Sequence, residues 1–510
     1  MPWLLAGDFN DMLHYDDKIG GASPCRLKGF RKWFDDNDMI DLGFSGPKFT
    51  WSNNRVFERL DRAVCNVQWR SLFNEASVKH LPRTKSDHCP IKISLKSSFS
   101  SSPIARPFRF EAMWLTHAHF KDFLMQQWAL TDGSVLDKTN ALVQPLLHWN
   151  STIFGNLRRR KSTLLARLAG VQNAMGPNTN RFLSKLENSL FEEYNEVIEQ
   201  ESLFWQQKSR VKWLQEGDRN TKFFHLTTLI RRRRNKIERL KDDNGEWIEG
   251  AGGLKKLAVS YFVGLFTQDQ QCCTFGDLPS FFPPIEAADL ANLAKNVDLI
   301  EVKVSLFNIG GLKAPGVDGF PACFFQNQWH LCGNEIYNLV DQAFRDSKLP
   351  EGLNSTLITM VPKVDNPSSM GQFRPISLCC TLYKTISKVL VARLRPILPG
   401  LISPNQVSFV PGRHISDNII IAQELMHKFR NAKGKKGFIA WKIDLSKAYD
   451  RLNWSYIEFV LNELGLPPST VQLIMHCVSS VQYQVFKKPR IKVNHWEIRS
   501  LNILPKILPN

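Results

Sequence analysis

The chain has 510 residues, 43% of them hydrophobic, and carries a formal net charge of +18 at pH 7. This length allows roughly two to four domains, and the composition is typical of globular proteins rather than fibrous or low-complexity ones. The positive charge favours a polyanionic partner, most commonly nucleic acid. We expect a soluble intracellular protein with no membrane partner, because no run of about 18 apolar residues is present and Asp8 lies too early for a signal-peptide core.

The first predicted strand covers residues 3–10 and delivers polar side chains at its end. Period-two alternation would place Asp8 and Asn10 on the same face of this strand. Asp8 could orient or deprotonate an attacking water, and Asn10 could donate to a phosphate oxygen. Further on, Asp87 adds a carboxylate beside His88, whose imidazole can stabilise charge that develops on a phosphodiester. The pattern predicts a site that handles phosphate.

The middle of the chain is basic and predicted to be mainly helical. Residues 151–241 hold 19 Lys and Arg against 9 Asp and Glu, which indicates a contact surface for nucleic acid. Cations and aromatic residues are interleaved over residues 207–225, a pattern that suits single-stranded nucleic acid and, with similar weight, core packing. One helix is predicted by an apolar stripe at spacings of four and three, formed by Phe182, Leu186, Leu190, Tyr194 and Val197.

Two shorter signals follow in the chain. Four consecutive arginines at residues 231–234 predict a solvated or nucleic-acid-facing helix face, with a nuclear-targeting signal as the alternative. The sequence Asp-Asn-Gly-Glu at residues 243–246 predicts a turn between two short strands.

The last part of the chain contains a strand that ends in a carboxylate. The apolar run of residues 438–443 leads to Asp444, and Tyr449 follows five residues later. A carboxylate at a strand exit can face a Mg²⁺ that bridges substrate phosphates, and the ring of Tyr449 could lie under the sugar of an incoming nucleotide. A buried strand followed by a helix N-cap is the alternative for this motif alone.

Two cations upstream of that strand can meet a triphosphate. Lys363 ends a predicted strand, and Arg374 follows after a loop that contains Pro, Gly and Ser. A hairpin of this kind presents a point charge and a guanidinium fork to the same ligand. Two solvated surface cations remain the alternative.

These motifs together resemble the reverse transcriptase of LINE-type (non-LTR) retrotransposons, most closely those of plants. Further blocks occur in the family's order at residues 314–320, 357–363, 373–378 and 402–413. The resemblance implies Mg²⁺ (or Mn²⁺) as cofactor, and an RNA template, a DNA target and deoxynucleoside triphosphates as partners. Its implied site consists of Asp444 as first catalytic carboxylate, Leu445 as backbone metal contact, Tyr449 as sugar gate, Lys363 and Arg374 as triphosphate contacts, and Gln406 and Phe409 beside the template and nascent pair.

The N-terminal motifs resemble the endonuclease/exonuclease/phosphatase family, in its apurinic-endonuclease-like branch. Between Asn10 and Asp87, the blocks at residues 49–52 and 59–62 also match this family. The resemblance implies that Asp8 activates water, Asn10 contacts phosphate and Asp87 orients the substrate or binds metal. It also implies a phosphate-facing His88 whose far ring nitrogen is held by Asp61. Trp51 would lie near the nucleic-acid groove or, as an alternative, in the core.

The expected fold class is α+β multidomain. The expected parts are a partial four-layer α/β endonuclease sandwich (1–96), a Ser/Pro-rich linker (97–107), a basic helical connector (108–250), partial reverse transcriptase fingers and palm (251–483) and an aberrant basic tail (484–510). The resembling families also use an Asn and a Glu ahead of the first strand and a Tyr-Ala-Asp-Asp hairpin, which we do not find. We therefore expect a truncated, catalytically incomplete chain, with a non-catalytic nucleic-acid-binding remnant as the alternative, located in the nucleus and cytoplasm by resemblance.

Overall fold

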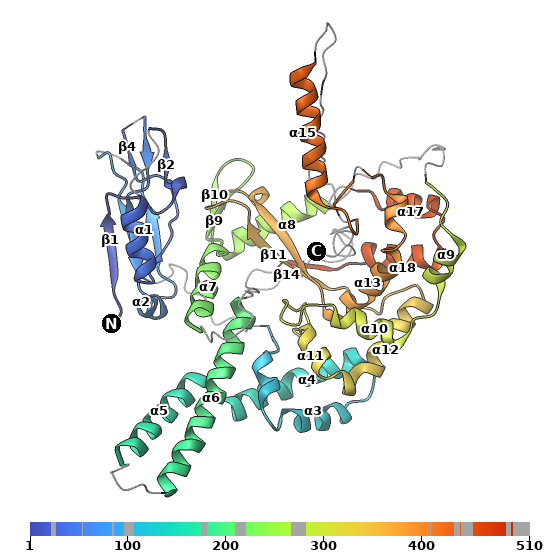
Figure 1. The fold of residues 1–510 in the computed structure, drawn as a ribbon, viewed down its shortest axis with the longest axis horizontal. Coiled ribbons are helices and arrows are strands. Elements are labelled where there is room, and N and C mark those ends of the chain that lie inside the picture. Colours follow the sequence, from blue (N-terminus) through green and yellow to red (C-terminus); the bar gives the residue numbers. More distant parts are fainter. Residues whose placement is uncertain are drawn as a thin grey trace. The chain divides into compact units, whose positions relative to one another are not determined.

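A computed structural model describes most of the chain, in which helices outnumber strands (Figure 1). The described residues are 1–21, 27–53, 55–83, 86–95, 107–174, 181–209, 221–266, 282–404, 406–408, 410–432, 439, 452–485 and 491–492. They form two compact units: unit 1 consists of Met1–Ala105, Val211–Leu254 and Met360–Arg374, and unit 2 of Arg106–Arg210, Lys255–Thr359 and Pro375–Asn510. The predicted connector contributes to both units.

Unit 1 is built from short strands in small sheets. Its strands are β1 (Leu4–Asp8), β2 (Lys18–Ile19), β3 (Ile40–Asp41), β4 (Trp51–Ser52), β5 (Phe57–Glu58), β6 (Asp61–Cys65), β7 (Ser77–His80), β8 (Ile91–Ser94), β9 (Arg239–Lys241) and β10 (Trp247–Glu249). They pair in the orders β1-β6-β3, β2-β5-β4, β7-β8 and β10-β9. The helices are α1 (Leu27–Asp36), α2 (Val67–Leu72) and α7 (Thr221–Arg234).

β6 is the central strand of unit 1, because it lies between β1 and β3 and all five of its residues are buried. One face of β6 supplies Ala63 and Cys65 to an apolar core that also contains Ile40, Trp69 and Val78. Burial of the larger aliphatic side chains of this core, Ile40 and Val78, contributes roughly 1.5–3 kcal/mol each. The strand therefore has little freedom to shift relative to its neighbours.

The turn predicted at residues 243–246 is confirmed. β9 pairs antiparallel with β10, and Trp247 lies opposite Lys241. The Asp242 carboxylate accepts from the backbone N–H groups of Asn244 and Glu246, which stabilises the tight turn.

Unit 2 is mainly helical. Its helices are α3 (Phe120–Ala129), α4 (Val135–Trp149), α5 (Leu157–Ala174), α6 (Arg181–Ser209), α9 (Ala287–Ala294), α10 (Leu299–Phe307), α11 (Ala322–Asn327), α12 (Trp329–Arg345), α13 (Thr381–Leu394), α14 (Leu398–Leu401), α15 (Ile415–Asn431), α17 (Trp454–Glu463) and α18 (Pro468–Ser479). α8 (Ala251–Phe266) begins in the residues of unit 1 and continues in those of unit 2. None of the helices among the described residues has both the length and the apolarity of a membrane span.

The long helix predicted from the apolar stripe is present as α6, which packs along α5 (Figure 1). Leu190 and Val197 are buried against Leu164 and Leu168 of α5, while Leu186 and Tyr194 pack at the edge. The stripe is wrong at its first member, since Phe182 is 70% exposed. Phe182 is the second residue of α6, and the adjacent Leu183 packs against the core between α5 and α6 instead.

A four-stranded sheet has the order β12-β11-β13-β14, with β11 (Thr356–Pro362), β12 (Phe373–Leu378), β13 (Tyr483–Val485) and β14 (Ile491–Lys492). β13 pairs parallel with β11, so that Thr356 lies opposite Tyr483. β14 falls within the predicted tail of residues 484–510, and it pairs antiparallel with β13.

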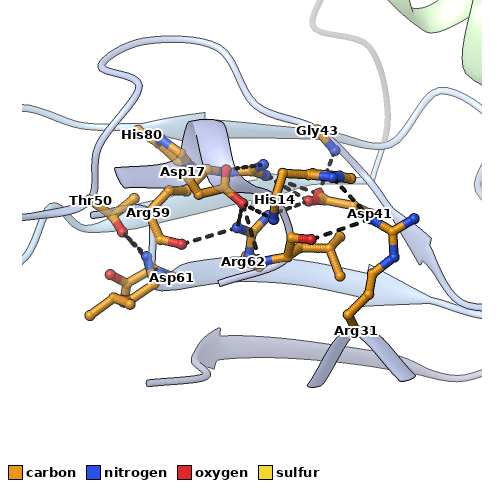
Figure 2. Close-up of polar contacts among 12 residues, drawn as sticks. His14, Asp17, Arg31, Asp41, Gly43, Thr50, Arg59, Asp61, Arg62 and His80 are labelled. Atoms are coloured by element: carbon orange, nitrogen blue, oxygen red, sulfur yellow. Dashed lines mark hydrogen bonds and ion pairs between the residues drawn. The ribbon is translucent and has the colours of Figure 1, made fainter. Parts of the chain in front are cut away.

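Buried charges connect the strands of unit 1 (Figure 2). Arg62, with a fully buried side chain, donates to Asp17 and, at 2.8 Å, to Asp41. Arg59 lies 2.9 Å from the same Asp41 carboxylate. Burial raises the pKa of Asp41, but the charges of Arg59 and Arg62 outweigh it, so this pKa lies below its usual value. We call these four residues the charge network.

We expect Arg62→Met to lower the free energy of unfolding of unit 1 by about 3–5 kcal/mol, because the buried Asp17 and the half-buried Asp41 lose a shared partner. The measurement is amide hydrogen exchange of the β6 residues in the full chain. Arg234→Ala is the control, since Arg234 and Asp365 form an exposed pair in the same unit and its loss is expected to cost under about 1 kcal/mol. Equal small losses in both variants would contradict a structural role for the charge network.

Candidate phosphate site and polymerase residues

The register of two strands places two carboxylates opposite each other. β1 pairs antiparallel with β6, and Asp8, the last residue of β1, lies opposite Asp61, the first residue of β6. The Asp61 residue is only 9% exposed, whereas Asp8 is exposed. Both side chains therefore lie at one end of the β1–β6 pair, with Asp8 toward solvent.

His88 joins this pair from a distant part of the chain. Its Nδ1 lies 2.8 Å from Asp61 Oδ2, and its Nε2 lies 4.0 Å from Asp8 Oδ2. An ionised carboxylate only accepts hydrogen bonds, so Nδ1 carries the proton and donates to Asp61. The predicted hydrogen bond between Asp61 and the far ring nitrogen of His88 is thus present, with the ring nitrogen as the donor. We call Asp8, Asp61 and His88 the phosphate site.

The charge of His88 follows from its neighbours. Partial burial lowers the pKa of His88, but the hydrogen bond and charge of Asp61, with the charges of Asp8 and Asp87, outweigh it. The pKa of His88 therefore lies above its usual value of 6.5. The protonated imidazole stabilises the fold below pH 6.5, and this contribution is lost as the pH rises through the raised pKa. A cation beside two carboxylates can stabilise a negatively charged phosphate group.

Asn10 is not placed as the alternation of a strand would place it. β1 ends at Asp8, and Asn10 has a φ of 51°, in the left-handed region. Its backbone N–H donates to Asp8 Oδ1 at 2.9 Å, which makes a local turn around the carboxylate. The expectation of a strand through residue 10, with both side chains on one face, is therefore wrong. The turn still keeps Asn10 next to Asp8.

Asp87 lies outside the phosphate site. Its carboxylate accepts from the Trp51 indole N–H at 2.8 Å and from the Ser86 hydroxyl. The hydrogen bond from Trp51 is the main reason that the pKa of Asp87 lies below its usual value. Trp51 is half-buried and thus neither a core residue nor a free surface ring.

A divalent ion fits this site only in part. Asp8, Asp61 and His88 can bring one ligand atom each within 4.8 Å of one another, and they are the one such group among the described residues. Mg²⁺ prefers several oxygen ligands, whereas this group has two carboxylates, each with one oxygen already in a hydrogen bond: Asp8 Oδ1 accepts from the Asn10 N–H and Asp61 Oδ2 accepts from His88.

The two predicted triphosphate contacts lie on one hairpin. Lys363 directly follows β11, Arg374 is the second residue of β12, and both are exposed. The Lys363 N–H donates to the Gln372 carbonyl at 2.8 Å, and its ammonium lies 3.1 Å from the Gly371 carbonyl. The expected strand, loop and strand around these cations are thus confirmed.

The remaining polymerase residues are mostly outside the described part of the chain. Asp444, Leu445, Tyr449 and Phe409 lie outside the described residues. Gln406 is exposed, and its side chain donates to the Ser408 carbonyl at 3.2 Å. The following Arg413 organises this loop, because its guanidinium donates to four backbone carbonyls, those of Pro399, Ile402, Ser403 and Gln406.

The glycine-containing block at residues 314–320 has a structural role in unit 2. A Cβ on Gly316 would lie 2.4 Å from the Cys380 nitrogen, and one on Gly319 would lie 2.5 Å from the Phe108 carbonyl oxygen. Gly319 also has a φ of +83°. Only glycine permits such close backbone crossings. The block therefore fixes the segment around Phe108 and the start of α13 against each other.

The comparisons with known proteins concern the C-terminal part. Residues 361–498 match the family described as reverse transcriptase (RNA-dependent DNA polymerase). This region begins two residues before Lys363, contains Asp444 and runs past residue 483, the predicted end of the polymerase part.

Three relatives come from transposable elements. The transposon TX1 uncharacterized 149 kDa protein of Xenopus laevis is 27% identical over 278 residues, covering 54% of this chain and 21% of that protein. The Pol polyprotein from the type-1 element R2 of Bradysia coprophila is 23% identical over 200 residues, covering 39% of this chain and 22% of that protein. The Pol polyprotein from the type-2 element R2DM of Drosophila melanogaster is 27% identical over 222 residues, covering 44% of this chain and 20% of that protein. The chain thus matches about a fifth of the length of each relative. Residues 361–498 contain a reverse transcriptase domain of the non-LTR retrotransposon family, similar to those of the TX1 and R2 elements.

Proposed function

We propose that this chain is part of a plant-type LINE protein that performs target-primed reverse transcription, with an endonuclease-like part ahead of the polymerase. The observation that carries the proposal is the reverse transcriptase match over residues 361–498. The convergence of Asp8, Asp61 and His88 supports the endonuclease-like part. Such proteins work on RNA and DNA in the nucleus and cytoplasm, where we place this one.

In the endonuclease-like part, each residue of the phosphate site has a distinct role. Asp8 is the exposed carboxylate and orients or deprotonates the attacking water. His88 faces the phosphate through Nε2 and stabilises the charge that develops on it, while Asp61 holds the ring through Nδ1. Asn10 contacts a phosphate oxygen, and Asp87, held by Trp51, orients the substrate.

In the polymerase part, Asp444 is the first catalytic carboxylate and Leu445 a backbone ligand of Mg²⁺ or Mn²⁺. Tyr449 excludes a 2′-hydroxyl from the incoming nucleotide by contact. The exposed cations of the hairpin, Lys363 and Arg374, bind the triphosphate. Gln406 and Phe409 line the template and nascent pair.

The 510-residue polypeptide on its own is proposed to bind nucleic acid without turnover. Two-metal phosphoryl transfer needs acidic ligands from two strands, and Asp444 belongs to the one polymerase carboxylate block that we recognise in the sequence. The phosphate site has two carboxylates for a metal ion, and one oxygen of each is already in a hydrogen bond. Binding, in contrast, needs only the basic surfaces.

Binding of single-stranded RNA is expected to fall steeply as salt rises, because released counterions dominate the affinity. Arg158 and Arg159 are exposed on α5 and are the first phosphate contacts to remove. Replacing both with Gln is expected to reduce the slope of log K against log salt by about 2. The measurement is fluorescence anisotropy of a labelled RNA. Salt-independent binding, or none at low salt, would argue against the proposal.

We expect neither reverse transcription nor DNA nicking from the polypeptide alone. Primer extension on an RNA template and nicking of supercoiled plasmid, each with Mg²⁺ or Mn²⁺, are the two assays. Asp444→Ala and Asp8→Ala are their matched controls, because a contaminating enzyme would be unaffected by either change. Deoxynucleotide incorporation that disappears in Asp444→Ala, or plasmid nicking that disappears in Asp8→Ala, would contradict this expectation and show that the 510-residue polypeptide is catalytically active.

A further inference from the structure

Thr50 is a buried polar residue that the proposed chemistry does not use. It lies immediately before β4 and is 0% exposed. Its hydroxyl oxygen accepts two backbone hydrogen bonds, from the N–H of Leu60 at 3.0 Å and from the N–H of Asp61 at 2.9 Å. Figure 2 shows Thr50 beside the backbone of Asp61 at the start of β6. One side-chain oxygen therefore satisfies two consecutive buried donors.

The backbone of Thr50 is bonded on both sides as well. Its N–H donates to the Glu58 carbonyl at 3.0 Å, and its carbonyl accepts from the Cys89 N–H at 2.6 Å. The next residue, Trp51, forms an antiparallel bridge with His88. Thr50 thus contacts both of the chain segments that carry the imidazole and its carboxylate partner.

The distance between Asp61 and His88 depends on these contacts. Asp61 and His88 are 27 residues apart, and their 2.8 Å hydrogen bond requires both backbones to be placed within a few tenths of an ångström. We propose that Thr50 is a positioning residue of the phosphate site, whose hydroxyl fixes the backbone of Asp61 while its carbonyl fixes the segment of His88. This inference rests on the proposed role of the site in binding phosphate.

Valine has nearly the shape of threonine and lacks the hydroxyl, so Thr50→Val leaves the Leu60 and Asp61 N–H groups without an acceptor. Thr50→Ser keeps the hydroxyl and is the conservative variant. Thr228→Val is the matched control, because Thr228 is a 1% exposed threonine of α7 in the same unit whose hydroxyl donates to the Phe224 carbonyl. Thr50→Val loses two buried hydrogen bonds and Thr228→Val loses one, but only Thr50 borders Asp61.

The readout is the NMR signal of the His88 Nδ1 proton in the full chain labelled with ¹⁵N-histidine. A proton shared with a carboxylate gives a low-field signal that exchanges slowly with water, and Asp61→Asn provides the reference without that carboxylate. We expect the signal in the wild-type protein, Thr50→Ser and Thr228→Val. We expect Thr50→Val to lose it and to resemble Asp61→Asn.

A signal retained in folded Thr50→Val, or lost in Thr50→Ser, would overturn the positioning role. If Thr50→Val does not fold, amide hydrogen exchange in the wild-type protein and Thr50→Ser decides. Slow exchange of the Leu60 and Asp61 amides in both supports the role, and fast exchange in either overturns it. Absence of nucleic-acid binding would remove the proposed function but would leave these measurements intact, so the two failures are distinguishable.

Discussion

The pairing of β1 with β6 is the constraint on which the candidate site depends. It sets Asp8 opposite Asp61, and a slip of one residue would turn every side chain of the moved strand to the other face. The slip is opposed because β6 is buried along its whole length and because Arg62 of β6 bonds to Asp17 and Asp41. The geometry of the phosphate site thus depends on interactions of residues that take no part in its proposed chemistry.

The predictions that succeeded rest on local patterns in the sequence. Local patterns were sufficient for the turn at residues 243–246, for the hairpin that carries Lys363 and Arg374, and for the helix α6. Each depends on residues close in sequence, where spacing and turn chemistry determine the structure. The error at Asn10 arose where β1 gives way to a turn within two residues, which alternation alone does not reveal.

Contacts between distant residues could not be predicted in the same way. Arg62 and Asp17 are 45 residues apart, and the Trp51 indole reaches Asp87 across 36 residues. No local periodicity relates such pairs, so the sequence alone does not distinguish a buried arginine from one on the surface. The role of Thr50 was harder still to predict. Thr50 lies in the block at residues 49–52, but its hydroxyl bonds to backbone groups, which no side-chain pattern reveals. The partner of His88 was predicted only because family resemblance supplied it.

Two parts of this chain are proposed to contact phosphate, in different ways. The reverse transcriptase domain presents exposed cations on a hairpin, suited to a mobile, highly charged triphosphate. The phosphate site in unit 1 presents a half-buried imidazole between carboxylates, which fits the proposed contact with one phosphodiester at a fixed position. A net charge of +18 favours the approach of polyanions to both parts.

The most direct test of this account is an NMR titration of the histidine-labelled chain with a short DNA duplex. His80 is the internal reference, because it is 1% exposed and stacked on Phe44 in the same unit. The account predicts a saturable shift of the His88 imidazole signals that Asp8→Asn alters, with His80 unchanged. A duplex that binds the chain while the His88 signals stay in place would contradict a phosphate-binding role for Asp8, Asp61 and His88.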